Sequence, residues 1–228
     1  MAGVLITGGS GPIGAAIAAH LADQGLRVVV QYGSNPPESG FEAVQADLAK
    51  SGFEERLLAA AGQVDILVNC AADQAMTAMS ALTSEEMAHM LAVNVTAPML
   101  LSRAFAAQVQ GQGVVVNISS IEAQNPARGH GHYAASKAAL ETITRAQAVE
   151  LAPRVRVNAV APGLIAREGI EAAWPEGVAR WKAACPLQRM GSPEDIAHAV
   201  AFLVSPRSEW INGVVLVVDG GVTARGGW

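Results

Sequence analysis

The sequence predicts a single α/β domain built on a parallel sheet with helices on both faces. Short apolar runs alternate with helix-like stretches along the whole chain, and this alternation is typical of a doubly wound parallel sheet. Most of the apolar runs are continuous in Val, Ile and Leu, as strands buried on both faces require. The length of 228 residues suits one domain (residues 1–228) with a full core, and no linker or repeat divides the chain.

The elements follow one another in a regular order, with one short connection. Residues 33–40 include two prolines and two glycines, and they are too few for a crossover helix of about 10–12 residues, so we expect an irregular loop there. Strands are predicted at residues 4–7, 28–32, 43–46, 66–69, 114–118, 156–160 and 214–218. Helices are predicted at residues 13–24, 53–61, 84–109, 132–151 and 193–205.

Composition excludes several classes of protein. The net charge of -5 leaves no basic footprint for nucleic acid. No apolar run reaches the roughly 20 residues of a membrane helix, and no charged segment precedes the first strand as in a signal peptide. We therefore expect a cytoplasmic protein. Cys70 and Cys185 offer neither a disulfide framework nor a metal site, and we interpret both as small buried hydrophobes.

A glycine-rich turn, Thr-Gly-Gly-Ser-Gly-Pro-Ile-Gly at residues 7–14, joins the first strand to the first helix. In this context glycines permit a tight turn, and the N–H groups of the helix N-terminus can bind a pyrophosphate. Pro12 suits the first helical position because its φ is fixed, although it provides no N–H for a phosphate. The turn therefore predicts a nucleotide-binding site.

Two polar residues stand where predicted strands end. Asp47 follows the third strand and Asn69 closes the fourth, at the carboxyl ends where open parallel sheets bind ligands. For either residue alone, a strand-end side chain that caps loop backbone is the favoured interpretation.

Tyr133 and Lys137 lie four residues apart in a predicted helix, which places both side chains on one face. A lysine cation one turn away is expected to lower the pKa of the phenol, so that the tyrosine could act as a general acid or base near neutrality. On its own this spacing is a weak signal, because an incidental pair on a solvated face looks the same.

Taken together, eight motifs in order resemble the short-chain dehydrogenase/reductase family over nearly the whole chain. Ser120 lies thirteen residues before Tyr133, which is the spacing typical of that family. The motifs are the glycine-rich turn, Asp47-Leu48, Asn-Cys-Ala-Ala at 69–72, Asn94, Ser-Ser at 119–120, Tyr133 with Lys137, Asn-Ala-Val-Ala-Pro-Gly at 158–163, and Asp-Gly-Gly at 219–221.

The resemblance implies a seven-stranded Rossmann-like sheet, a nicotinamide cofactor, and a catalytic tetrad of Asn94, Ser120, Tyr133 and Lys137. Tyr133 would exchange a proton with the substrate oxygen, and Ser120 would hydrogen-bond that oxygen. Lys137 would hold the nicotinamide ribose and lower the tyrosine pKa, and Asn94 would position a water that links Lys137 to solvent.

The resemblance also implies the cofactor contacts, with Asp47 on the adenine and Asn69 on the adenosine side. The expected contact residues are Gly8, Ser10, Pro12, Ile13, Gly14, Tyr32, Ser34, Asn35, Asp47, Leu48, Asn69, Ala71, Tyr133, Lys137, Pro162, Gly163 and Ile165. Four features depart from the family: Pro12 replaces a glycine, Asn-Cys-Ala-Ala at 69–72 replaces the usual Asn-Asn-Ala-Gly, Arg167 stands near the usual threonine after Gly163, and residues 33–40 lack the usual helix. Arg167 or Glu168 could face the substrate instead.

The end of the second strand favours NADP(H) over NAD(H). NAD sites usually hold the ribose 2′-OH with an acidic residue about 20 positions after the turn, and here none occurs before Glu38. No Arg or Lys stands there to pair with a 2′-phosphate either, but Ser34 and Asn35 could donate hydrogen bonds to it. NAD remains open.

In the family, the segment after Gly163 covers the active site as a lid; here it spans about residues 164–185. We expect it to be loop-like with a short helical piece, and Trp174 and Trp181 could form a substrate wall or only anchor the lid. The opposite wall should be formed by residues between Ser120 and Tyr133, namely Glu122, Gln124, Asn125 and Arg128.

The resulting hypothesis is an oxidoreductase that moves hydride between NADP(H) and a carbonyl or alcohol, with a small ketone or a β-ketoacyl thioester as first choice. Alternatives are a pteridine-type C=N reductase and a catalytically silent NAD(P)-binding sensor. The family resemblance further implies a homo-oligomer, commonly a tetramer, with no nucleic acid or membrane partner.

Overall fold

The computed structural model describes residues 2–37 and 40–224, and it contains one seven-stranded sheet with the strand order β3-β2-β1-β4-β5-β6-β7. Every neighbouring pair of strands is parallel, so the predicted doubly wound α/β fold is confirmed. The strands are β1 (Gly3–Thr7), β2 (Arg27–Tyr32), β3 (Glu42–Gln45), β4 (Ile66–Asn69), β5 (Gly113–Ile118), β6 (Val155–Pro162) and β7 (Val215–Val218).

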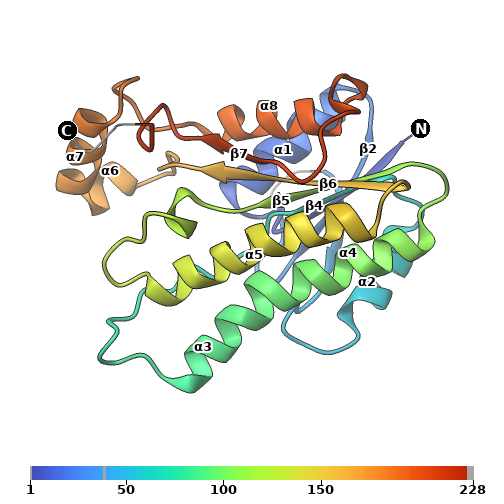
Figure 1. The fold of residues 1–228 in the computed structure, drawn as a ribbon, viewed down its shortest axis with the longest axis horizontal. Helices are drawn as coiled ribbons and strands as arrows, with labels where there is room; N and C mark the ends of the chain where they lie inside the picture. Colours follow the sequence, from blue (N-terminus) through green and yellow to red (C-terminus); the bar gives the residue numbers. More distant parts are fainter. Residues whose placement is uncertain (1, 38–39, 225–228) are drawn as a thin grey trace.

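Helices cover both faces of the sheet (Figure 1). One layer holds α1 (Pro12–Asp23) and α8 (Pro193–Val204), and the other holds α2 (Phe53–Ala61), α4 (Ala97–Gln108) and α5 (Gly131–Glu150). Alternate residues of β1 supply both cores: Val4 and Ile6 pack on the α1 side and Leu5 on the α4 side, as the two-residue period of a strand requires.

The predicted helix at 84–109 is wrong in one respect, because it is interrupted by a π-helical turn. α3 (Ser84–Leu91) is followed by η1 (Ala92–Thr96), a π-helix that contains Asn94, and then by α4. The whole stretch, Ser84–Gln108, is long and apolar enough to cross a membrane by length and composition. Here Leu101 and Phe105 of α4 pack into the core of the sheet. Single π-helical turns within α-helices are frequent at functional sites.

The connection between β2 and β3 contains no helix in its described residues, 33–37 and 40–41, in agreement with the expected irregular loop. Glu38 and Ser39 lie outside the described residues. The strand that follows, β3, lies at the edge of the sheet and is largely exposed. The side of the sheet near this loop is therefore less covered than the centre.

Candidate active site

The tetrad residues come from three neighbouring parts of the fold. Asn94 lies in η1, Ser120 follows β5, and Tyr133 and Lys137 lie in the first two turns of α5. The Nζ atom of Lys137 is 5.7 Å from the centre of the Tyr133 ring, and the Ser136 hydroxyl between them accepts a hydrogen bond from Asn94 Nδ2 at 3.0 Å. The fold thus gathers the predicted acid–base group at the carboxyl edge of the sheet.

The expected fall in the pKa of Tyr133 is not observed. Burial raises the pKa of this phenol to about 12, an effect that the nearby Ser120 hydroxyl partly opposes and the Glu122 carboxylate reinforces. Tyr133 is 7% exposed, and removal from water disfavours the charged phenolate. At neutral pH the free protein therefore holds Tyr133 in its protonated form.

Lys137 is buried and uses few of its donors. Its side chain is 2% exposed, and Nζ donates one hydrogen bond, to the carbonyl of Ile118 at 2.8 Å. An ammonium group has three N–H donors, so two find no partner among the described residues. Burial lowers the pKa of Lys137 from 10.5 to about 8, and this cationic donor is available for a polar ligand.

This lowered pKa makes the stability of the free protein depend on pH. Between pH 8 and 10.5 the unfolded chain holds a proton on Lys137 that the folded protein has lost, so this site makes unfolding less favourable as pH rises. We expect the difference in the free energy of unfolding, wild type minus Lys137→Met, to grow by up to about 3 kcal/mol across this interval. Urea titrations at both ends would measure it, and a constant or shrinking difference would contradict the described burial.

The side chain of Asn94 is fully engaged within the protein. Its Oδ1 accepts a hydrogen bond from the Asp73 N–H at 2.7 Å, and its Nδ2 donates to the Asp73 carbonyl at 2.9 Å as well as to Ser136. Asn94 therefore ties the loop after β4 to α5. The expected water link from Asn94 to Lys137 stays a prediction.

Ser120 is oriented by the segment that follows it. Its Oγ accepts a hydrogen bond from the Glu122 N–H at 3.1 Å, which leaves the hydroxyl proton available for donation. Cys70, the residue after Asn69, is the other polar neighbour of the tetrad. Burial raises the pKa of this thiol to about 12, with Lys137 acting in the opposite direction. Contrary to expectation Cys70 is only half-buried, whereas Cys185 is buried.

The glycine-rich turn has the geometry of a phosphate cradle. Gly8 has a φ of 72°, and a Cβ on Gly14 would lie 2.4 Å from the Gly8 carbonyl oxygen. The helix α1 begins at Pro12 without a side-chain cap, and the N–H groups of Ile13 and Gly14 have no hydrogen-bond partner among the described residues. Free donors at a helix N-terminus suit an anionic phosphate, so these residues fit a dinucleotide.

The loop after β2 lies beside this turn. The Ser10 hydroxyl donates a hydrogen bond to the carbonyl of Asn35, and the Gly33 carbonyl accepts one from the Gln45 side chain at 2.9 Å. The side chains of Ser34 and Asn35 are exposed next to the turn, and Tyr32 ends β2 at the same edge. The structure thus brings these predicted contact residues together.

Two residues expected on the adenosine side differ in their surroundings. Asp47 and Leu48 follow β3, and Asp47 is exposed, with Oδ1 accepting a hydrogen bond from the Ala49 N–H. The Asn69 side chain is buried and donates to Asn117 Oδ1 at 2.8 Å and Ser102 Oγ at 3.2 Å. The Asn69 amide therefore holds β4, β5 and α4 together, and its contact with a cofactor stays a prediction.

The chain resembles known oxidoreductases over almost its full length. Residues 9–223 match the family model described as enoyl-(acyl carrier protein) reductase. Dehydrogenase/reductase SDR family member 4 of Homo sapiens is 36% identical, over 97% of this chain and 87% of the human protein.

The chain belongs to the short-chain dehydrogenase/reductase (SDR) family.

Other SDR relatives carry names of sugar dehydrogenases. Glucose 1-dehydrogenase 2 of Bacillus subtilis is 32% identical, over 96% of this chain and 93% of that protein. The structure of aldohexose dehydrogenase from Thermoplasma acidophilum, in ligand-free form, superposes with a TM-score of 0.90 at 28% identity, covering 100% of this chain and 96% of that one. The likeness of the fold therefore extends over the whole chain.

The lid of this SDR protein is more helical than expected. It contains α6 (Ile170–Ala173) and α7 (Pro175–Ala184), and Pro175 occupies the first position of α7, where its fixed φ favours a helix start. The base of the lid is fixed by Ile165, which forms a β-bridge with Gly191. Arg167 and Glu168 are exposed on the lid.

The two lid tryptophans differ in role. Trp181 packs so closely on Gly163, at the end of β6, that a Cβ there would lie 2.8 Å from its ring, and its Nε1 donates to the Arg189 carbonyl. Trp181 therefore anchors the lid. Trp174 packs on Gly177 and remains 48% exposed, so it is the tryptophan available at the lid surface.

Two buried polar residues of the SDR site were not predicted. The Thr7 hydroxyl accepts hydrogen bonds from the N–H groups of Cys70 and Ala71 at 3.0 and 3.1 Å. Gln31 accepts from the Gly8 N–H through Oε1 and donates to the Ala46 carbonyl through Nε2. Both residues join strand ends beneath the cofactor cradle. The sequence feature that could have indicated them is a polar residue at the end of an otherwise apolar strand.

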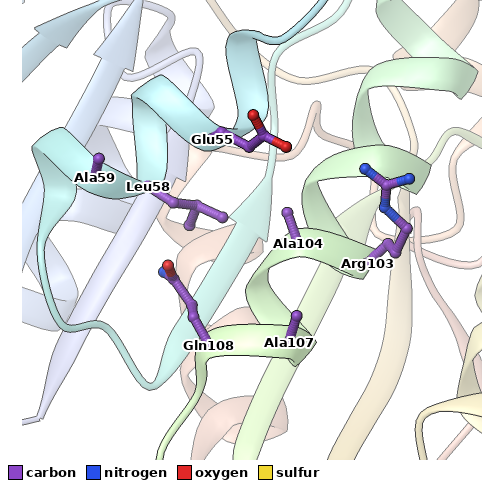
Figure 2. Close-up of a pocket in the computed structure, with 7 residues that line it drawn as sticks. All are labelled: Glu55, Leu58, Ala59, Arg103, Ala104, Ala107 and Gln108. Atoms are coloured by element: carbon purple, nitrogen blue, oxygen red, sulfur yellow. The ribbon is translucent and has the colours of Figure 1, made fainter.

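A separate hollow of about 400 Å³ lies between α2 and α4 (Figure 2). Leu58 and Ala104 line it, together with Glu55 and Arg103. It contains none of the predicted cofactor or tetrad residues. The hollow and the predicted site at the carboxyl edge of the sheet are therefore separate.

Proposed function

We propose that this protein is an NADP(H)-dependent oxidoreductase that interconverts a ketone and a secondary alcohol. The observation that supports it best is the grouping of the Tyr133 phenol, the buried Lys137 ammonium and the Ser120 hydroxyl at the same sheet edge as the glycine-rich turn. This arrangement offers a proton donor, a cation and a hydrogen-bond donor beside a dinucleotide cradle, as carbonyl reduction requires.

The nicotinamide would supply or accept the hydride, and the chain's own groups would manage the proton and the developing charge. In reduction, Tyr133 transfers its phenolic proton to the carbonyl oxygen. Ser120 donates its free hydroxyl proton to the same oxygen and stabilises negative charge there. Lys137 offers two unused N–H donors to the cofactor ribose, and the N–H groups at the start of α1 hold the phosphates.

The protonated state of Tyr133 suits its proposed role as the general acid in reduction. A general acid must carry its proton before the reaction begins, and the raised pKa of about 12 keeps Tyr133 protonated in the free protein. For alcohol oxidation the same group would first have to lose that proton, a step that a bound cationic nicotinamide and Lys137 would assist.

We propose NADP(H) rather than NAD(H) because Ser34 and Asn35, not a carboxylate, stand exposed beside the turn. Replacing Ser34 with Asp would place a negative charge where the 2′-phosphate is expected. We expect kcat/KM with NADPH to fall by about 10-fold or more, since like charges at such a site cost several kcal/mol, and kcat/KM with NADH to fall less. Ser34→Ala is the matched control without charge. Steady-state rates of the wild type and both variants with NADPH and NADH measure this preference. A wild-type protein that prefers NADH would contradict the proposed use of NADP(H).

For the substrate we propose a small ketone or a β-ketoacyl thioester. Relatives named as glucose and aldohexose dehydrogenases support a carbonyl or alcohol carbon as the reacting group. A panel of ketones, ketoacyl thioesters and pterins with NADPH tests this. Oxidation of NADPH with pterins alone would favour the C=N reductase, and binding of NADPH without any turnover would favour the sensor.

The expected homo-oligomer and cytoplasmic location stay predictions. Large apolar side chains remain exposed at α8 and β7, including Phe202, Val217 and a 99% exposed Trp210 beside them, in keeping with a face that another subunit covers.

A further inference from the structure

A half-buried acid–imidazole pair lies beside the proposed proton donors. Glu122 belongs to the short 3₁₀ turn η2 (Ile121–Ala123), and His130 is the residue that precedes α5. His130 Nδ1 lies 2.8 Å from Glu122 Oε2 and 3.1 Å from Oε1. The Ala127 N–H donates a further hydrogen bond to Glu122 Oε2 at 3.3 Å. The carboxylate and the imidazole are thus held in one orientation.

One atom of the pair is left without a partner. His130 Nε2 is removed from water, yet it has no hydrogen-bond partner within residues 2–37 and 40–224. A buried polar atom without a partner costs free energy comparable to a lost hydrogen bond. A ligand group can complete the hydrogen bonding of this atom once the His130 ring turns toward it, a change of side-chain rotamer that is common on binding.

The pair also touches both proposed proton donors. Glu122 donates its N–H to Ser120 Oγ, and the His130 ring lies 5.5 Å from the Tyr133 ring, centre to centre, tilted by 59°. A carbonyl oxygen bound by Ser120 and Tyr133 would therefore have Glu122 and His130 on one side. A substituent on the carbon next to that carbonyl would face His130 when it is turned to this side.

On the basis of the proposed function, we propose that Glu122 and His130 form a subsite for a substrate hydroxyl on the carbon next to the reacting carbonyl. The protein would accordingly act on α-hydroxy ketones and on the vicinal diols that correspond to them. His130 would contact the hydroxyl directly, and Glu122 would be a positioning residue that acts through His130.

A hydroxyl suits the pair better than other polar groups. The Glu122 carboxylate can only accept, so Nδ1 carries the proton that it shares with Glu122. Nε2 is then an acceptor in the neutral imidazole and a donor in the imidazolium. A hydroxyl both donates and accepts, so it satisfies Nε2 in either state. A carboxylate or phosphate would satisfy only the imidazolium and would be repelled by Glu122.

The test compares ketones that differ in one group. Hydroxyacetone and butanone have the same shape but carry a hydroxyl or a methyl group next to the carbonyl, and 2-hydroxycyclohexanone with 2-methylcyclohexanone forms a second pair. NADPH oxidation gives kcat/KM for each ketone, and the ratio within a pair is compared between wild type and His130→Phe. The intrinsic reactivity of each ketone is the same with the wild type and with His130→Phe, so it cancels when the two ratios are compared.

We expect the hydroxy-to-methyl ratio to fall by about 10- to 100-fold in His130→Phe, the range for a lost hydrogen bond to a buried partner. The ratio should also fall in Glu122→Ala, and His130→Gln, which restores a side-chain donor and acceptor, should recover part of it. His20→Phe, the same exchange on α1, is the matched control. Turnover with an unchanged ratio in His130→Phe would overturn this subsite alone. Absence of NADPH oxidation with every carbonyl compound would overturn the proposed function itself.

Discussion

Replacing Tyr133 with Phe is expected to lower kcat for ketone reduction by about 10²- to 10⁴-fold, the usual contribution of a positioned general acid. The phenol is the proposed proton donor, and Phe retains its buried ring while removing only the hydroxyl. The Kd for NADPH should stay near the wild-type value, because the cradle at Gly8–Gly14 is untouched. Steady-state rates and fluorescence titration with NADPH measure both quantities.

Thr142→Val is the matched control for this substitution. It removes a hydroxyl from the same helix, α5, at an exposed position whose oxygen bonds only the Ala138 carbonyl. Its kcat should match that of the wild type. If Tyr133→Phe turned over ketones at the wild-type rate, another group would have to supply the proton, and the assigned role of Tyr133 would be wrong.

Replacing Gly14 with Ala is expected to raise the Kd for NADPH by about 10²-fold, the scale on which a displacement of about 1 Å affects a positioned site. A Cβ at this position would lie 2.4 Å from the Gly8 carbonyl oxygen, a backbone atom that cannot move without opening the turn. The N–H groups at the start of α1 would then lose their alignment with the phosphates. Fluorescence titration with NADPH measures the effect.

Gly11→Ala gives a comparison within the same turn. A Cβ on Gly11 would meet only the Gly8 carbonyl oxygen, at 3.4 Å, which is close to ordinary contact, so the rise in Kd should be much smaller than for Gly14→Ala. Equal effects of the two substitutions would mean that the close approach of Gly14 to Gly8 is not what shapes the cradle.

The fold could be predicted because each strand is indicated by a short continuous stretch of apolar residues. Residues such as Val4, Leu5 and Ile6 form a continuous apolar run, and such runs separated by helices leave few alternatives to a parallel sheet. The π-helical turn at Asn94 could not be predicted, because one extra residue in a helix leaves almost no trace in its apolar period. It arises from the contacts of Asn94 with Asp73 and α5.

The sequence predicted the relative placement of Tyr133 and Lys137 but not their electrostatics. The spacing of Tyr133 and Lys137 correctly places them on one helix face, but spacing carries no information about burial. Burial dominates here: it raises the pKa of Tyr133 and lowers that of Lys137. The same limitation applies to Asn69, whose position at a strand end suggested a ligand contact although its amide bonds Asn117 and Ser102 in the core.

The interactions of Thr7, Gln31 and the Glu122–His130 pair depend on long-range packing. Thr7 meets Cys70 and Ala71 across neighbouring strands, and Glu122 meets His130 across a loop. No local sequence pattern predicts such contacts, because each of these polar residues occupies a strand-end or loop position where polar residues are common.

The central claim is that hydride passes between a nicotinamide bound at the glycine-rich turn and a carbonyl carbon held at Ser120 and Tyr133. It is tested most directly with NADPH that carries deuterium at the transferable position of the nicotinamide, incubated with the purified protein and a ketone that it reduces. Mass spectrometry of the alcohol should find one deuterium on the former carbonyl carbon, and Tyr133→Phe should form this product far more slowly. An alcohol without deuterium, or no alcohol with any ketone tested, would contradict the claim.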